Sequence, residues 1–427
     1  MKKLSILILV FVTVLVVEAK VKTEDLFDIL HYVNTHSPRL QAKRAELRSI
    51  DTLKLQAQTG YLPRVDLTAN ISPEHRDYKT QFLNNNMNDN VMAHSFGVDA
   101  RINLYEGGKT DGTVKIANYK KITAEFSLIV EEQNIYLQAV QAYILCLDAM
   151  EVLQLKINNR RILEAYCSKC KNQVSLGRGT QTDVAQAEAR LSGAISQVTE
   201  AETELDNAKE QFCAIVGKFP ENLTEIPFEK ITPLIPASVD ECEKFALKAN
   251  PLILHLEIME KIAMENRNIS GSGMSPSVNA RVFVGRQLKQ PMISRMNRYQ
   301  AELSVSIPIY DGDLAYYKTI AAEHNITMAL CDIEDARRHT IKATRIALNE
   351  IRKYKSEIQS AQDQVKANER ALAGVQDEAQ NGSRTTLDLL NAEQELLDSK
   401  VKLTRARHGL IISYFKALHA MGKLGLK

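Results

Sequence analysis

Tryptophan is absent from this 427-residue sequence, and aromatic residues make up only 6% of it. Proline is absent from residues 74–219 and 309–427, and glycine is absent from residues 113–176 and 313–373. Because proline and glycine are the strongest helix breakers, stretches without them permit very long helices. The scarcity of aromatic residues favours helices packed side by side over a thick globular core. The formal net charge is only +2, so the composition gives no indication of a nucleic-acid partner.

Cysteine is also sparse, with six residues in the whole chain. Cys167 and Cys170 form a C-x-x-C motif, which is the spacing of many redox and metal-binding pairs. They lie inside a predicted helix, without a second pair or a histidine cluster nearby, so we predict no metal or redox role. Whether the cysteines are paired or free stays open at this stage. No glycine-rich phosphate loop follows a strand and no nucleophile motif is present, so we predict neither an enzyme nor a cofactor.

The N-terminus has the features of a secretory signal peptide. A short basic start precedes an apolar run over residues 4–17, and Ala19 provides a plausible cleavage site. We expect residues 1–19 to be removed on export. No later apolar run approaches the roughly 20 residues that a membrane-spanning helix needs. If the exported chain enters a membrane, we expect it to do so with β-strands.

Two segments of the chain are near-copies of each other. Residues 177–188 and 382–393 both contain Gly-x-x-Thr-x-x-Asp followed by Ala-Glu, at an offset of 382 − 177 = 205 positions. Each copy stands between two long helical segments, which predicts a helix end, a tight turn and a new helix start. The chain is therefore predicted to contain repeat one at residues 20–219 and repeat two at residues 237–427, joined by a proline-rich connector at residues 220–236.

Four segments alternate between apolar and polar residues, at 64–71, 95–104, 277–284 and 302–309. This alternation predicts four β-strands, each with one aliphatic face and one polar face. One interpretation is a small soluble sheet that covers a helical core. Export of the chain and the aliphatic strand faces favour the other interpretation, a barrel wall between lipid and a wet lumen. Because a barrel in lipid must close, four strands are too few, whereas three copies supply twelve. The asparagine-rich residues 84–90 are expected to form an exposed loop.

Long helical stretches follow both predicted strand pairs. Apolar residues between Ile122 and Ile157 recur in alternating steps of three and four, which is a heptad pattern. A helix over residues 109–176 would be roughly 100 Å long at 1.5 Å per residue. Returning helices with comparable apolar stripes are expected over residues 182–217 and 386–418. The predicted fold class is therefore mainly α with a small β part, built from long antiparallel helical hairpins with an internal two-fold repeat.

The signal peptide, the two strand pairs, the two long hairpins and the doubled tip motif together resemble the TolC family of outer-membrane efflux proteins. The resemblance covers essentially the whole mature chain as a single domain, residues 20–427. It implies a homotrimer with a transmembrane β-barrel in outer-membrane lipid and a helical α-barrel that extends into the periplasm. It also implies a passive exit duct of a tripartite efflux or type I secretion system. The helical tips would dock on a periplasmic adaptor, the membrane fusion protein, attached to an inner-membrane pump.

In that family, bonds between tip helices and rings of acidic side chains hold the periplasmic mouth shut. The resemblance gives Arg384 the position of the gate arginine and Asp183 that of its acidic partner. It gives Asp388 the position of the first ring aspartate and Asn391 that of the second, so one acidic ring is missing. Ala379 stands where some members use a tyrosine to brace the mouth. The alternative for both aspartates is the ordinary role of a carboxylate in the first turn of a helix, which contributes about 0.3–1 kcal/mol.

The predicted adaptor-docking surface consists of the tip turns, at Gly177 and Thr180 in the first hairpin and at Gly382 and Thr385 in the second. Glycine supplies a backbone shape there that other residues resist. An exported coiled-coil scaffold or adhesin without a conduit is the alternative function. A scaffold has no need for four alternating strands, whereas a barrel requires them. The sequence therefore favours the duct.

Overall fold

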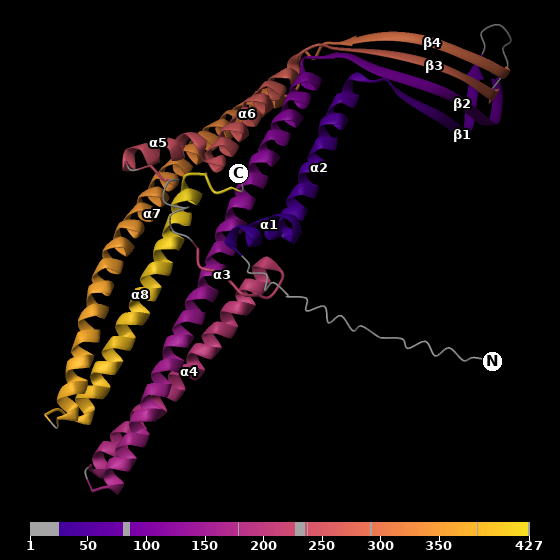
Figure 1. The fold of residues 1–427 in the computed structure, drawn as a ribbon. Coiled ribbons are helices and arrows are strands. Elements are labelled where there is room, and N and C mark those ends of the chain that lie inside the picture. The colour runs from indigo at the N-terminus through magenta and orange to yellow at the C-terminus, as the bar shows by residue number, and fades with distance from the viewer. Residues whose placement is uncertain are drawn as a thin grey trace, which may run out of the picture.

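Two long helical hairpins extend in the same direction from a single four-stranded sheet (Figure 1). The computed structural model describes residues 25–79, 86–177, 179–226, 235–236, 238–290, 293–381 and 383–425. The predicted signal peptide and the predicted turn glycine Gly382 lie outside the described residues.

Both halves of the chain have the same order of elements: two shorter helices, two strands, one very long helix and one returning helix. The first half contains α1 (Leu26–His36), α2 (Pro38–Gln58), β1 (Arg64–Lys79), β2 (Asn86–Glu106), α3 (Lys109–Ser175) and α4 (Gln181–Val216). The second half contains α5 (Val239–Ala249), α6 (Pro251–Gly271), β3 (Ser277–Gln290), β4 (Ile293–Ser306), α7 (Leu314–Gln380) and α8 (Thr386–Ala420). Short 3-10 turns, η1 (Thr59–Tyr61) and η4 (Ser272–Met274), lead into β1 and β3. The predicted fold class, mainly helical with a small sheet, is confirmed.

The long helices lie where the sequence predicts them. α3 and α7 contain 67 residues each, which corresponds to about 100 Å. α4 runs back along α3, and α8 runs back along α7, so each pair is an antiparallel hairpin (Figure 1). The free ends of both hairpins point away from the sheet, which places the repeated tip motifs at the far end of the molecule (Figure 1). The exact limits of the two repeats and of the connector stay predictions.

The largest apolar core lies midway along the hairpins, where α1, α3, α4, α5 and α8 meet. Tyr143 of α3, Phe212 of α4 and Leu26 of α1 are fully buried there. The Tyr143 hydroxyl donates to the Thr224 carbonyl at 2.7 Å and so holds the start of the connector against α3. Contrary to the expectation from the sequence, α3 contains an 18-residue window that is apolar enough to span a membrane by composition. Because 61% of this window is buried inside the protein, it has the character of a core helix.

The sheet is antiparallel in the order β1-β2-β3-β4, so β1 and β4 form its two edges. In the observed register, Leu67 pairs with Val98, and Val98 pairs with Val284. The aliphatic positions of all four strands therefore share one face, as the alternation predicts. Large side chains that remain exposed on this face are Val65, Leu67, Ile71, Met92, Phe96, Val98, Val282, Val284, Tyr299, Leu303 and Val305.

The opposite face of the sheet is polar, and its central charges are paired. Asp99 of β2 is only 1% exposed and bonds the guanidinium groups of Arg281 on β3 and Arg101 on its own strand. Charge-assisted bonds of this kind are the stronger class of polar contact, and here they join β2 to β3. Beside this cluster, the Phe283 ring lies over Gly97 and Gly285, and a Cβ at either glycine would come within 3 Å of the ring.

Two predictions about the strands are wrong in detail. β4 ends at Ser306, so Ile307 and Ile309 do not belong to it. Pro308 stands between them and has no amide proton for a ladder hydrogen bond. The asparagine-rich segment was expected to be a loop, but its residues 86–90 form the start of β2 and pair with β1. Backbone pairing extends the hairpin here independently of the polarity of the side chains.

Candidate functional site

The first tip turn, between α3 and α4, has the conformation that its glycine predicts. Gly177 has φ +70°, in the left-handed region that other residues rarely adopt. Nothing lies within 4 Å of a Cβ placed there, so the backbone shape, not lack of room, calls for glycine. The Thr180 hydroxyl accepts from the Asp183 amide at 3.2 Å, and the Asp183 carboxylate accepts from the Thr180 amide at 3.1 Å. This reciprocal pair is a capping box that starts α4.

The second tip turn, between α7 and α8, uses the same chemistry. The Thr385 hydroxyl accepts from the Asp388 amide at 3.2 Å, and the Asp388 carboxylate accepts from the Thr385 amide at 3.1 Å. The Ser383 amide donates to the Glu378 carbonyl at 2.9 Å and closes the end of α7. Gly382 itself lies outside the described residues. The sequence repeat at the tips is thus a repeat of helix-capping chemistry.

Capping leaves the negative charge of Asp388 in place. Its Oδ2 accepts from both the amide and the hydroxyl of Thr385, at 3.1 and 2.8 Å. The Thr385 hydroxyl, and then its amide, lower the pKa of the Asp388 carboxyl below its ordinary value. The carboxylate is therefore ionised at neutral pH. The ordinary first-turn role is observed for Asp183 and Asp388 alike, and a ring role for Asp388 stays a prediction that this geometry permits.

Arg384 bonds an acid of its own turn. Its Nε donates to Glu378 Oε2 at 2.8 Å, and the two side chains are 50% and 52% exposed. Exposed ion pairs of this kind contribute only about 0–1 kcal/mol, so the guanidinium can exchange partners easily. Within the described residues of this chain Arg384 pairs with Glu378, so the predicted bond between Arg384 and Asp183 of a neighbouring tip helix stays a prediction. Sequence reasoning missed Glu378, although an acid just before the turn and a base just after it were a usable signal.

Asn391 connects the two hairpins. Its Oδ1 accepts from Arg190 Nη2 at 2.8 Å, and this bond links α8 to α4 across 201 positions of sequence. Beside it, Leu390 of α8 packs with Leu163 of α3 and Ala194 of α4. Sequence reasoning missed Arg190, because spacing along the chain carries no signal for a contact between two hairpins.

A buried carboxyl lies next to this contact. Glu393 of α8 is only 6% exposed, and its carboxyl faces the Tyr166 hydroxyl of α3 and the Gln376 amide of α7. The Gln376 amide donates to the Tyr166 hydroxyl at 3.3 Å. Burial raises the pKa of Glu393 above its ordinary value. Burial also raises the pKa of Tyr166, and the nearby charge of Glu393 raises it further.

The equivalent position in the first repeat has a different environment. Glu188 lies 393 − 188 = 205 positions before Glu393, yet it is exposed and forms an ion pair with Lys171 at 2.8 Å. The two glutamates are equivalent in sequence and differ only in tertiary placement.

Ala379, the position of the missing tyrosine, lines a hollow between the hairpins near the tips. Arg384 and Thr386 line the same hollow from the turn and α8, and Tyr166 lines it from α3. An aromatic ring is therefore present at this hollow, but it comes from the opposite hairpin.

The cysteines carry free thiols in every case. Cys167 and Cys170 are buried and pack on Ala187 of α4, and burial raises the pKa of the Cys170 thiol. Within the described part of the chain, no group of three or more His, Cys, Asp or Glu residues lies close enough to hold a metal ion. The C-x-x-C motif thus serves as part of the α3–α4 packing.

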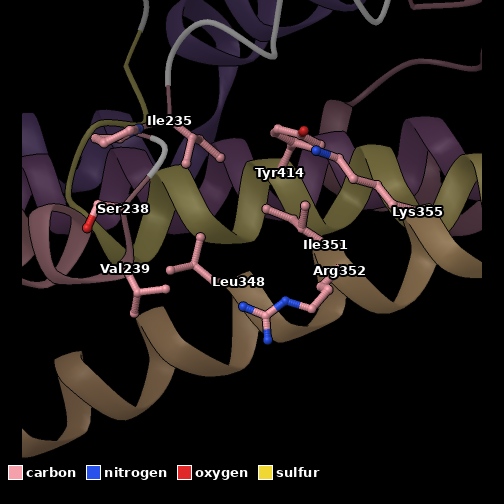
Figure 2. Close-up of a pocket in the computed structure, with 9 residues that line it drawn as sticks. Ile235, Ser238, Val239, Leu348, Ile351, Arg352, Lys355 and Tyr414 are labelled. Atoms are coloured by element: carbon pink, nitrogen blue, oxygen red, sulfur yellow. The ribbon is translucent and has the colours of Figure 1, made fainter.

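A second hollow lies near the core and away from the tips. It is bounded by the segment that leads into α5 and by facing surfaces of α7 and α8 (Figure 2). Its lining combines aliphatic side chains with the cations of Arg352 and Lys355 and the hydroxyls of Ser238 and Tyr414. The lining residues are Ile235, Pro236, Ser238, Val239, Leu348, Ile351, Arg352, Lys355 and Tyr414.

The two-fold order of strands, long helices and capped tips is matched by a family model. The model describes outer membrane efflux proteins and matches residues 30–218 and 244–419, one segment in each half of the chain. The chain belongs to the outer membrane efflux protein family.

Individual efflux proteins are similar over most of their length. The chain is 24% identical to the outer membrane efflux protein BepC of Brucella suis over 390 residues, which cover 90% of this chain and 82% of BepC. It is 23% identical to the outer membrane protein TolC of Escherichia coli over 422 residues, which cover 94% of this chain and 83% of TolC. The fold is similar to that of VceC from Vibrio cholerae, with a TM-score of 0.79, 16% identity and coverage of 93% of this chain and 96% of VceC.

Membership of the efflux family places the protein in the outer membrane, with its helices extending into the periplasm. The family is one of channels and not of enzymes. The resemblance to TolC that the sequence suggested is confirmed, and so is the function of an outer-membrane channel. The roles of individual tip residues stay predictions.

Proposed function

We propose that three copies of this chain form one continuous duct across the outer membrane and the periplasm. The duct passively conducts cargo that an inner-membrane pump delivers through a periplasmic adaptor. Membership of the efflux family supports the outer-membrane part of this proposal. The observation that carries the trimer is the sheet, because within the described residues its edge strands β1 and β4 pair only on their inner sides.

An unpaired strand edge is incompatible with lipid, because no water is present to satisfy its backbone groups. Each copy contributes four strands, so β4 of one copy must pair with β1 of the next until the barrel closes. Two copies give eight strands, whose interior is filled by side chains, whereas three give twelve strands and a lumen.

The two faces of the sheet match a barrel wall. The outward face is aliphatic and exposed in the single chain, with Leu303 at 66% and Leu67 at 81%. The other face carries the paired charges around Asp99, which suit a wet interior. This is the arrangement expected for a strand between lipid and water.

The helices also present surfaces for neighbouring copies. α7 keeps large apolar side chains exposed in the half that lies nearer the sheet, and exposed apolar side chains gathered in one region suit a protein contact. In the trimer these side chains pack against an adjacent hairpin and close the helical tunnel. They are Leu314, Tyr316, Tyr317, Met328, Leu330 and Ile346.

We assign the periplasmic mouth and the adaptor contact to the hairpin tips. The turns that begin at Gly177 and Gly382 and continue through Thr180 and Thr385 form the docking surface. Their position at the end of the hairpins remote from the sheet supports this assignment (Figure 1).

The gate is assigned to four side chains of the same tips. Arg384, Asp183 and the ring residue Asp388 lie in the capped turns, and Asn391 holds the two hairpins of one copy together. Weak, exposed bonds at this place suit a mouth that opens when a partner binds.

The proposal is tested by the size of the detergent-solubilised protein and by a pair of substitutions on neighbouring residues of β4. Leu303→Arg places a charge on the lipid face, which costs about 2–4 kcal/mol at the bilayer midplane and less towards the interfaces. Ser304→Arg places the same charge on the polar face and should be tolerated. We expect a trimer by sedimentation for the parent protein and for Ser304→Arg, and loss of membrane-inserted trimer for Leu303→Arg. A monodisperse monomer without detergent, or equal insertion of both variants, would contradict the barrel.

A further inference from the structure

We propose that Glu393, Tyr166 and Gln376 form a clasp between the two hairpins of one protomer, and that uptake of a proton by Glu393 removes the cost of burying its charge and so favours the closed mouth. The inference rests on the gate proposed at the tips. It goes beyond that gate because it names the group that would make opening depend on pH.

The clasp joins three helices at one point. Glu393 lies on α8, Tyr166 on α3 and Gln376 on α7, and the Gln376 amide already donates to the Tyr166 hydroxyl at 3.3 Å. A tyrosine whose oxygen accepts one bond still has its own proton to donate, and the facing carboxyl is the available acceptor. Only 6% of Glu393 is exposed, so these neighbours supply most of the surroundings of its carboxyl.

The charged groups around Glu393 have other partners. Lys400 of α8 favours the charged form of Glu393, but its ammonium is bonded to Glu369 of α7 at 3.2 Å. Arg161 of α3 lines the same hollow as Glu393. Arg190 of α4 donates to the amide oxygen of Asn391 at 2.8 Å. Among the described residues none of these cations forms an ion pair with Glu393. A buried carboxylate without a paired cation is unfavourable, so the neutral acid is the form that suits the closed clasp.

The direction of the pH effect follows from linkage. Burial raises the pKa of Glu393 in the closed arrangement above that of a hydrated glutamate. The closed arrangement therefore binds more protons than the open one. The stabilisation of the closed arrangement is fully present below the pKa that Glu393 has in the open form. It is lost as the pH rises through the higher pKa that Glu393 has in the closed form. Acid favours closing, and a rise in pH favours opening. Each unit of difference between the two pKa values changes the ratio of open to closed tenfold.

The first repeat provides a matched control. Glu188 is the sequence equivalent of Glu393, but it is exposed and paired with Lys171. Removing its charge leaves the clasp intact. The two glutamates therefore separate the effect of the buried site from the effect of removing any carboxylate near the tips.

The test measures conductance of the trimer in planar bilayers against pH, from about pH 4 to pH 8, in 1 M salt. At this ionic strength the Debye length is about 3 Å, so exposed charges at the mouth are screened while the buried carboxyl is not. The parent channel should conduct several-fold more at high pH than at low pH, with one midpoint. Glu393→Gln should conduct at the low level throughout, and Glu188→Gln should keep the parent profile.

A second variant keeps the test decisive if Glu393→Gln assembles poorly. Tyr166→Phe preserves the ring but removes the hydroxyl, which favours the charged form of Glu393. The midpoint should then move to higher pH, an effect that a purely structural role of the ring would not produce.

The outcomes separate the clasp from the duct. Channels in which Glu393→Gln and Tyr166→Phe both keep the parent profile would overturn the clasp alone. Loss of the pH response in Glu188→Gln would also overturn the clasp, because the response would then arise from an exposed carboxylate and not from Glu393. Failure of every version, the parent included, to form channels would overturn the duct and the clasp together.

Discussion

Replacement of Asn391 by aspartate should convert a hydrogen bond between the hairpins into an ion pair. Arg190 Nη2 already lies 2.8 Å from Asn391 Oδ1, so a carboxylate at this position meets the guanidinium without rearrangement. The substitution also adds a second acidic side chain close to Asp388. The Asn391→Asp substitution therefore changes two quantities, which are the stability of the closed state relative to the open state and the negative charge at the mouth.

The size of the effect follows from the exposure of the pair. Hydrogen bonds to charged groups contribute roughly 1.5–3 kcal/mol where solvent is limited. Both Arg190 and Asn391 are exposed, so the smaller range of about 0.2–1 kcal/mol for surface ion pairs applies. A gain of about 0.5 kcal/mol in each of three copies that open together gives roughly 1.5 kcal/mol. This corresponds to about a tenfold lower ratio of open to closed channels.

Open probability in planar bilayers is the direct measurement. Asn391→Asp should lower it about tenfold at 0.1 M salt and much less at 1 M, because salt screens an exposed pair. In the double variant Arg190→Gln/Asn391→Asp the stabilisation should disappear. The new carboxylates are then unpaired, so block by a trivalent cation should be stronger than in Asn391→Asp alone.

Two results would refute this reasoning. The first is an increase of open probability in Asn391→Asp. The second is the same decrease in the presence and absence of Arg190, since the added charge would then act elsewhere.

Four further predictions concern the tips. Arg384→Ala should raise single-channel conductance if the guanidinium helps to close the mouth, and Glu378→Gln should do so less, because Glu378 is only its partner within the turn. Asp388→Asn should abolish block by trivalent cations, measured as bilayer current. Thr385→Ala removes the cap at a cost of about 0.5–2 kcal/mol but keeps the carboxylate, so it should lower the melting temperature and leave block in place. Gly177→Leu should reduce export while normal amounts of trimer remain in the membrane, because leucine resists the φ of +70° that this turn needs. Normal export by this variant would show that the turn is not part of the docking surface.

Local features of the fold could be predicted from the sequence. The helices follow from long stretches without proline or glycine, and the strands follow from strict alternation, because both patterns act over a few neighbouring residues. The doubled tip motif predicted two turns, and the capping boxes of Thr180 and Thr385 are the local bonds that make those turns. The errors in the strands, at Ile307, at Ile309 and at residues 86–90, lie at strand ends, where backbone pairing and the position of a proline outweigh side-chain pattern.

By itself, the sequence determined the two-fold architecture, the polarity of each strand face and the capped tips, because each of these is encoded in contacts between near neighbours in the chain. Only the tertiary structure decided which of two equivalent glutamates is buried. Glu188 and Glu393 stand in the same motif, yet one meets Lys171 at the surface and the other faces Tyr166 and Gln376 between the hairpins. The tertiary structure likewise decided the pairing of Arg190 with Asn391. Burial and partners of these side chains depend on how the two hairpins pack against each other, and the energy of that packing is distributed over contacts that lie far apart in the sequence.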